Sequence, residues 1–337
     1  MATFTPKFRP NRRSLMGGAA AMAGLTLLPR GALSAEEKKV NFYNWDTYIG
    51  EDTLENFQDA TGIEAKMDLF ADNDELFAKL KEGNPGYDLI VPTNDYVERM
   101  LVAEMLQPLN YDLIPNISNV ADAFREATFD PGRKHSVAYM WGTIGLGFRK
   151  SNVEETPTSW KWLYDSDKYA GKIALLGDGQ NVLSHAFKYM GKDLNSTDPA
   201  VFKAAEEMLI AQKKSIKVFA DDNGQDLLAS GEVDLAQEWN GDLLQVMDED
   251  DDVSFVVPDE GGLLWQDCLC IPKDAPHYEN AHALINFILD ADAGAEIADF
   301  IQYATPNAAA RAKLSDDYNK NPAIFPTEEV LAKCEPA

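Results

Sequence analysis

Strand-like and helix-like patterns alternate along this chain, and the alternation occurs twice. In the first half, three β-prone runs alternate with amphipathic helical stretches. This β-α-β-α-β-α order predicts a mainly parallel sheet with helices on both faces, the architecture of the α/β class. The strands are expected at 39–43, 63–70 and 88–91, and the helices at 52–60, at 74–82 and from Asp95 onward.

The pattern restarts at residue 172, which predicts a second lobe of the same kind. A later strand at 267–271 and apolar helices from Ala281 and Ala293 are expected to return to the first lobe. Two crossings between lobes would form a hinge. We assign residues 36–144 and 266–311 to lobe 1 and residues 145–265 and 312–337 to lobe 2. The expected strands of the second half are 172–176, 217–219, 233–237 and 253–257, and its helices are 181–190, 199–213, 224–230 and 241–247.

Aromatic and polar residues follow several of the predicted strands at the point where each strand ends. Trp45 follows the first strand, residues 93–95 follow the third, and Asp178 follows the first strand of the second half. Trp239 and Asp242 follow the strand at 233–237. In open α/β sheets ligands bind beyond the carboxyl ends of the strands. These residues are therefore predicted to line one cleft.

A tryptophan and a carboxylate occur together at three of the predicted cleft positions, 45–46, 239–242 and 265–267. A cation over an indole face gains roughly 0.5–2 kcal/mol, and a carboxylate adds charge-assisted hydrogen bonds. The combination favours an alkylammonium ligand. Trp162 and Asp165 have a similar spacing but no position in the predicted cleft.

The segment around Trp265 is expected to be extended, so its side chains should alternate between two faces. Trp265 and Asp267 would share one face, with Gln266, Cys268 and Cys270 on the other. Cys334 is the third cysteine. Free thiols are expected, with one bridge to Cys334 as the alternative.

The usual signatures of catalysis and metal binding are missing from the sequence. It has four histidines, no HExxH motif and no Cys–His spacing suited to zinc. The glycines of 142–147 lack the order of a dinucleotide-binding loop and are interpreted as packing or hinge residues. The acidic run at 248–252 is interpreted as an exposed turn, because the glycine and final glutamate of a calcium loop are absent. No catalytic residue, metal or cofactor is predicted.

Residues 1–35 are interpreted as an export signal. A basic stretch precedes an apolar run at 16–28, and small residues at 32–35 offer a cleavage site. Arg12 and Arg13 resemble a twin-arginine signal, with the general secretory route as the alternative. Either route leads to the periplasm. No later segment holds the ~18 uninterrupted apolar residues of a membrane helix.

The charge of the chain limits its partners. Without the five basic residues of 1–35, 25 basic residues face 56 acidic ones, which gives a net charge of −31. Such a surface repels nucleic acid and anionic lipid and attracts cations. We therefore expect neither nucleic-acid binding nor membrane insertion after removal of the signal.

Five segments in the same order resemble the spermidine/putrescine-binding proteins of bacterial polyamine ABC transporters. They are 44–48 (NWDTY), 87–92 (YDLIVP), 239–242 (WNGD), 260–267 (EGGLLWQD) and 303–307 (YATPN). The resemblance extends from about Lys39 to Pro326. It implies the two-lobed type II periplasmic binding protein fold, an inner-membrane ABC permease as partner, and no catalysis. We expect a monomer.

The resemblance also implies roles for individual residues. The implied aromatic walls are Trp45, Tyr48, Trp239, Trp265 and Tyr303. The implied ammonium acceptors are Asp267 and Asp242, and the further polar contacts are Asp178, Thr47, Asp46 and Thr93. Asn181 stands where some relatives have a glutamate, and Asp95 stands where some have an aromatic residue. Both are included among the candidate ligand-binding residues, and the choice between putrescine and spermidine stays open.

Two other functions remain as alternatives at this stage. One is a binding protein of the same fold for another cationic solute. The other is a secreted glycosidase, since paired carboxylates beside tryptophans can also cleave a glycan.

Overall fold

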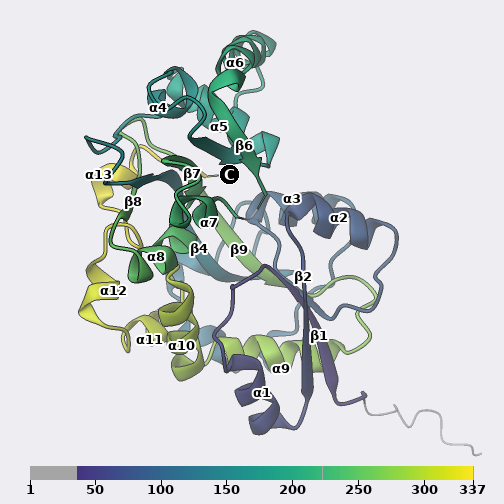
Figure 1. Ribbon diagram of the computed structural model, residues 1–337. Coiled ribbons are helices and arrows are strands. Elements are labelled where there is room, and N and C mark those ends of the chain that lie inside the picture. The colour runs from purple at the N-terminus through teal and green to yellow at the C-terminus, as the bar shows by residue number, and fades with distance from the viewer. Residues whose placement is uncertain (1–35, 222, 337) are drawn as a thin grey trace, which may run out of the picture. The chain divides into compact units, whose positions relative to one another are not determined.

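The computed structural model describes residues 36–221 and 223–336 (Figure 1). Residues from Glu37 onward form one compact unit. The predicted export signal lies outside the described residues. The longest described helix has 14 residues, and none of the helices in these two ranges is long and apolar enough to cross a bilayer.

Ten strands of the described chain form one sheet, with the order β2-β1-β3-β9-β4-β7-β5-β6, β10 beside β9 and β8 beside β4. The strands are β1 (Lys39–Asn44), β2 (Glu64–Leu69), β3 (Leu89–Ile90), β4 (Ser136–Arg149), β5 (Ile173–Leu176), β6 (Ile216–Ala220), β7 (Leu235–Trp239), β8 (Val253–Val256), β9 (Leu263–Cys270) and β10 (Glu335–Pro336).

The predicted helices begin within a few residues of their expected positions, and four short helices, α4, α11, α12 and α13, were not predicted. The helices are α1 (Thr53–Thr61), α2 (Asn73–Lys81), α3 (Asn94–Val102), α4 (Lys161–Tyr164), α5 (Gly179–Tyr189), α6 (Pro199–Gln212), α7 (Gly224–Ala229), α8 (Asn240–Glu249), α9 (Tyr278–Ile288), α10 (Ala291–Ile301), α11 (Ala308–Arg311), α12 (Asp316–Lys320) and α13 (Glu328–Leu331). The α9 helix starts three residues before Ala281, where the sequence placed its beginning.

The long strand β4 lies at the centre of the sheet and belongs to both of its parts. Residues 136–143 pair with β9, residues 144–148 pair with β7, and residues 146–149 pair with β8, all antiparallel. We call β2, β1, β3, β9 and β10 with residues 136–143 the first half-sheet. The second half-sheet comprises β7, β5, β6 and β8 with residues 144–149.

The prediction of mainly parallel sheets holds only in part, because β4 introduces antiparallel pairs in both half-sheets. Within each half-sheet the predicted strands do pair in parallel, β1 with β2 and β3, and β5 with β6 and β7. The β3–β9 pair is also antiparallel. The sheet is therefore mixed.

The glycines of β4 were interpreted as hinge or packing residues, and the strand around them was missed. They are packing residues within a strand. A Cβ on Gly145 would lie 2.6 Å from the Val256 carbonyl, and a Cβ on Gly147 would lie 2.6 Å from the Leu243 side chain. Neighbouring elements approach the backbone of β4 too closely for any larger residue.

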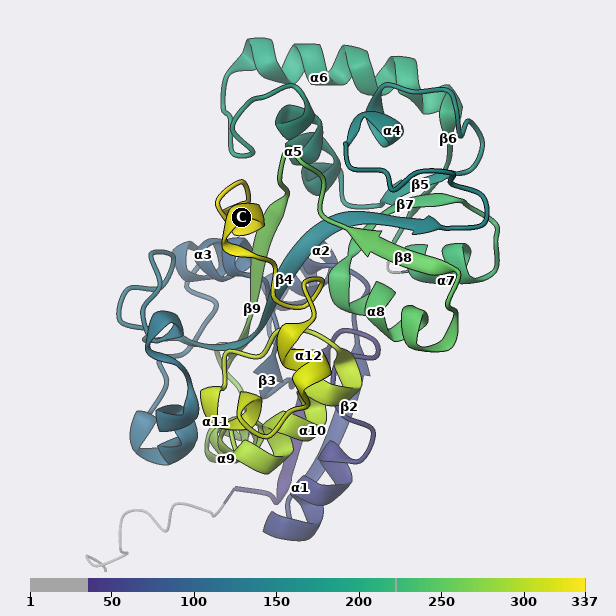
Figure 2. The ribbon, with the colours of Figure 1, turned by 90° about the vertical axis from the view of Figure 1, so that its left-hand side faces the viewer.

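Helices cover each half-sheet, as Figures 1 and 2 show. Helices α1 and α9 pack beside β2 and β1, and α5, α4 and α7 pack beside β5 and β7. Several helices begin at an aspartate whose side chain accepts hydrogen bonds from the first turn, among them Asp72 before α2 and Asp178 before α5. Because α2 and α5 follow β2 and β5, these caps lie at the carboxyl ends of the strands.

Candidate functional site

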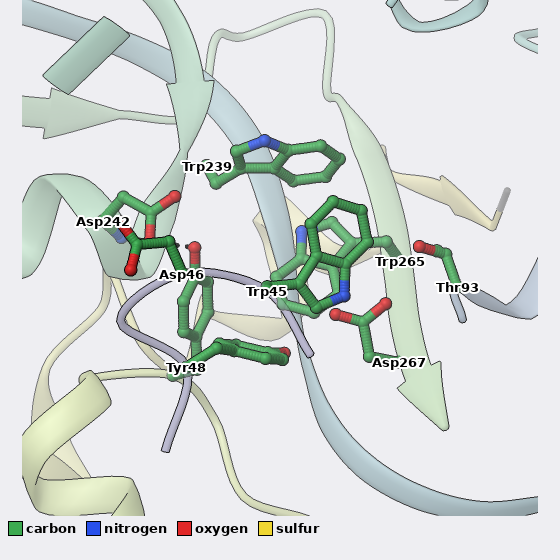
Figure 3. Close-up of a pocket in the computed structure, with 9 residues that line it drawn as sticks. Trp45, Asp46, Tyr48, Thr93, Trp239, Asp242, Trp265 and Asp267 are labelled. Atoms are coloured by element: carbon green, nitrogen blue, oxygen red, sulfur yellow. Dashed lines mark hydrogen bonds between the residues drawn. The ribbon is translucent and has the colours of Figure 1, made fainter. Parts of the chain in front are cut away.

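Nine residues line a cavity of about 40 Å³, which we call the aromatic cavity (Figure 3). They come from the ends of β1 and β7, from β9, from the beginnings of α3 and α8, and from the segment after α10. Each of the nine is a candidate that the sequence analysis named. They are Trp45, Asp46, Tyr48, Thr93, Trp239, Asp242, Trp265, Asp267 and Tyr303.

The rings of the aromatic cavity form a chain of edge-to-face contacts. Trp265 is central, with its ring centroid 5.6 Å from that of Trp239 and 5.1 Å from that of Tyr303. Tyr303 in turn lies 5.2 Å from Tyr48. Trp45 is held separately, since its indole nitrogen donates to the Val91 carbonyl at 2.9 Å. The indole and phenol rings are thus packed against one another or hydrogen-bonded to the backbone.

Two glycines allow these rings to approach the backbone. A Cβ on Gly142 would lie 2.6 Å from the Trp265 ring, and a Cβ on Gly241 would lie 2.4 Å from the Tyr303 ring. The backbone nitrogen of Asp242 donates to the Tyr303 hydroxyl at 3.3 Å. The glycine in the Trp-Asn-Gly-Asp motif therefore gives Tyr303 its place beside Asp242.

Three carboxylates face the aromatic cavity, those of Asp46, Asp242 and Asp267. In the view of Figure 3, Asp46 and Asp242 lie on one side of Trp45 and Asp267 lies on the other. Asp267 is only 6% exposed. Burial, followed by the Asp267 charge, raises the pKa of Tyr48 well above its usual value, so this phenol stays protonated. Carboxylates therefore lie on both sides of the Trp45 ring.

The alternation predicted for β9 is present. Trp265 and Asp267 line the aromatic cavity. On the opposite face, Arg133 donates hydrogen bonds to Gln266 and to the sulfur of Cys268. Burial raises the pKa of the Cys268 thiol to about 12, which leaves it unreactive at neutral pH.

The three cysteines of the chain are free in this structure, so the alternative of a bridge to Cys334 is not realised. Within residues 36–221 and 223–336, no group of three or more histidine, cysteine or carboxylate side chains is placed to hold a metal ion.

A second cavity of about 150 Å³, the acidic cavity, shares Trp45, Thr93 and Trp239 with the aromatic cavity. Five carboxylates line it. They are those of Asp72, Asp74, Asp95, Asp178 and Asp221. The predicted residues Asp95, Asp178 and Asn181 lie here, beside the aromatic cavity and not within it.

The sequence analysis missed several residues of the acidic cavity. Asp72, Asn73 and Asp74 begin three residues after the end of β2, at the start of α2, and Asp221 directly follows β6. The strand-end rule that selected Trp45 and Asp178 would have found them.

Hydrogen bonds from helix ends and neutral side chains hold the carboxylates of the acidic cavity. Asp178 Oδ1 accepts from the Gln180 backbone nitrogen at 2.7 Å, and its Oδ2 accepts from Asn181 Nδ2 at 3.1 Å. The Tyr96 hydroxyl donates to Asp74 at 2.6 Å. Burial raises the pKa values of Asp95 and Asp178, and nearby carboxylates add to this effect. Helix N-termini ordinarily attract anionic ligands. Here aspartate side chains already lie at the helix N-termini, so the cavity presents negative charge.

Thr47 is the one candidate that lines neither cavity. It is exposed, and its backbone has a φ of 45°. Its backbone nitrogen donates to Asp46 Oδ1 at 3.0 Å. A β-branched residue with positive φ is uncommon. Thr47 thus contacts the aspartate that faces the cavity and does not itself reach it.

Comparison with known proteins adds relatives over most of the chain. A profile of the bacterial extracellular solute-binding proteins matches residues 52–327. The chain is 33% identical to the spermidine/putrescine-binding periplasmic protein of Salmonella typhimurium over 317 residues, 94% of this chain and 91% of that one. It is also 33% identical to the putrescine-binding periplasmic protein PotF of Escherichia coli, over 90% of this chain and 87% of the relative.

A solved structure agrees with these relatives. A Listeria monocytogenes chain assigned to a spermidine/putrescine ABC transporter superimposes with a TM-score of 0.85 at 28% identity. The superposition covers 89% of this chain and 93% of that one. The α/β solute-binding fold is therefore shared. The family is one of transport proteins, so the glycosidase alternative is discarded. On these matches, the chain belongs to the bacterial extracellular solute-binding proteins, in the family of the spermidine/putrescine-binding periplasmic proteins.

Proposed function

We propose that this protein is a periplasmic receptor that captures a polyamine, putrescine or spermidine, and delivers it to an ABC importer. The observation that carries the proposal is the aromatic cavity, where indole and phenol rings lie between carboxylates. The names of the relatives include both amines and the periplasm, which supports the ligand class and the compartment.

The ligand chemistry follows from the geometry of the cavity. Asp267 would receive one ammonium group, and Asp242 with Asp46 would receive another. The methylene chain would pack between Trp45, Trp239 and Trp265. Because burying an unpaired charge is costly, an amine whose ammonium groups miss these carboxylates would bind weakly.

Two lobes would close around the ligand. Residues 36–144 with 266–311 would form lobe 1, and residues 145–265 with 312–337 would form lobe 2. Two of the crossings, at 144–145 and 265–266, lie within β4 and β9. By this division Trp239, Asp242 and Trp265 lie in lobe 2 and Asp267 lies in lobe 1. Closure would enclose the ligand between them, and the closed monomer would be recognised by the inner-membrane permease.

Titration calorimetry of the mature protein tests the proposal. Putrescine or spermidine should bind in the micromolar range or tighter, about −8 kcal/mol or better. Cadaverine, lysine and arginine serve as comparison ligands for another cationic solute. If neither polyamine gives heat or a thermal shift at millimolar concentration, the polyamine assignment is wrong.

A further inference from the structure

Arg99, on α3, lies beside the acidic cavity and contacts three of its lining residues. Its Nη2 donates to Gln180 Oε1 at 2.5 Å and lies 3.7 Å from Asp95 Oδ2. Its guanidinium carbon is 4.3 Å from the centroid of the Tyr96 ring. Gln180 Nε2 in turn donates to Asp95 at 3.4 Å. Since α3 follows β3 and α5 follows β5, these bonds join helices from the two half-sheets.

Carboxylates outnumber cationic side chains around Arg99. Five carboxylates line the acidic cavity. In the described ranges 36–221 and 223–336, the one ion pair made by any of the five is that between Asp95 and Arg99. The donors to Asp72, Asp74 and Asp178 are backbone nitrogens, a phenol and an amide. Arg99 therefore supplies the cation that this cavity would otherwise draw from a ligand.

The two cavities meet at Trp45, Thr93 and Trp239. A diamine held between the carboxylates of the aromatic cavity would stay within that cavity. A longer polyamine would extend past the shared tryptophans and bring a further ammonium among the carboxylates of the acidic cavity. There it would approach Asp95, whose carboxylate already lies 3.7 Å from the guanidinium of Arg99, a like charge beside the residues that line the cavity.

We propose that Arg99 is a specificity-determining residue that disfavours longer polyamines, because its guanidinium takes the place of a further ammonium beside the acidic cavity. The inference rests on the proposed function. It goes beyond that function by naming what limits the length of the amine. Arg99 also links α3 to α5, and loss of this link would weaken binding of every amine alike. The proposal therefore predicts a change in the relative affinities for different amines, and not an equal change for all of them.

The test compares putrescine, spermidine and spermine by calorimetry on the full mature protein and on Arg99→Gln. The ratio of spermine affinity to putrescine affinity should rise roughly tenfold in Arg99→Gln, the size expected when one like charge is removed a few ångströms from an ammonium. Arg99→Lys keeps the charge and should keep the wild-type ranking. Lys203→Gln removes an equal charge from exposed α6, where Lys203 lies 3.9 Å from Glu207, and should also leave the ranking unchanged.

An equal change in affinity for all three amines in Arg99→Gln would overturn the proposal, as would a ratio that moves toward putrescine. The same shift in Lys203→Gln would also overturn it, because net charge alone would then be the cause. If the wild-type protein binds none of the amines, the proposed function itself fails. That result is distinguishable, since it appears before any variant is compared. Thermal unfolding of each variant confirms that the proteins compared are folded.

Discussion

Asp267 is a carboxylate that is 6% exposed and lies beside Trp265 on β9. Opposite charges attract more strongly at a buried site than at an exposed one, because less water screens them. An ammonium group that reaches Asp267 would therefore be held mainly by this carboxylate, and the surrounding rings would keep water out. Binding energy should therefore depend more on the charge of Asp267 than on any single ring.

Replacement of Asp267 by asparagine tests this ranking. Asp267→Asn is nearly isosteric, keeps a hydrogen-bond acceptor and removes the charge. We expect it to weaken polyamine binding by about 2–5 kcal/mol, because a desolvated ammonium would be left without its counter-charge. Trp265→Ala should cost less, about 1–3 kcal/mol, through lost cation–π and apolar contact. Calorimetry measures both values.

The Trp162–Asp165 pair provides the matched control. Asp165 accepts a hydrogen bond from the Tyr189 hydroxyl at 2.9 Å and lines neither cavity. Asp165→Asn should leave polyamine affinity unchanged. Wild-type affinity in Asp267→Asn, together with loss of binding in Trp265→Ala, would mean that the hydrocarbon and not the charge holds the ligand.

His185 predicts how stability changes with pH. Burial lowers the pKa of His185 to about 4, while its unfolded value is 6.5. Its ring joins the Asn181 carbonyl at 2.7 Å to the Leu263 backbone nitrogen at 3.2 Å. Above pH 6.5 the ring is neutral in both states, and its contribution to stability is fully present. As pH falls from 6.5 to 4 the unfolded chain takes up a proton and the folded chain does not, which costs about 3 kcal/mol.

Thermal unfolding of the wild type and of His185→Gln at pH 7.5, 5.5 and 4 measures this contribution. The wild type should lose more stability than the variant across the interval, although the variant starts less stable at pH 7.5. Carboxylates also titrate there, so the difference between the two proteins is the informative quantity. Equal losses would show that His185 does not titrate as described.

At the scale of elements, β4 shows what the sequence could not reveal. Strands such as β1 and β5 are short apolar runs bounded by turn residues, so their pattern identified them. The glycines of β4 lower strand propensity and suggest a hinge. The reason for each glycine lies in distant segments, such as Trp265 over Gly142 and Phe255 over Gly145. A single sequence carries no signal for such contacts.

The candidate site was more predictable than the central strand. Trp45 and Trp239 follow strands that the pattern located, and the family resemblance supplied Tyr48 and Tyr303. The division into two cavities could not be predicted. The two cavities meet at Trp45, Thr93 and Trp239, and the Arg99–Gln180 bond between α3 and α5 beside the acidic cavity is not encoded by any local pattern.

Gly142 links the β4 strand to the aromatic cavity. In Gly142→Ala the new Cβ would lie 2.2 Å from Asn240 Oδ1 and 2.6 Å from the Trp265 ring. We expect a loss of about 1–3 kcal/mol in stability, since overpacking forces neighbouring atoms apart. Polyamine affinity should fall as well, because Trp265 must move. Denaturant unfolding and calorimetry measure the two effects.

Gly179, the first residue of α5, is the control for this substitution. A Cβ there would meet nothing within 4 Å. Gly179→Ala should therefore leave stability unchanged or raise it by up to about 1 kcal/mol, as expected for alanine in place of glycine in a helix. Tolerance of alanine at both positions would contradict the account of β4 given above.

At the scale of the whole molecule, the net charge of −31 that remains without residues 1–35 should steer cations toward the protein. Electrostatic steering raises association rates and weakens as salt screens the field. We predict that the association rate of spermidine falls on the order of tenfold between low salt and 0.5 M salt, with a smaller change in the dissociation rate. Stopped-flow kinetics measures both. An association rate independent of salt would mean that the acidic surface plays no part in capture.

The aromatic cavity also has an optical consequence. Three of the six tryptophans, Trp45, Trp239 and Trp265, line it. Their emission depends on the polarity and charge around each indole, and a docked cation alters both. Half of the tryptophans of the molecule therefore line the cavity in which we propose that the polyamine binds. Polyamine binding should therefore change the intrinsic tryptophan fluorescence of the protein, which can be measured in dilute solution with no dye attached.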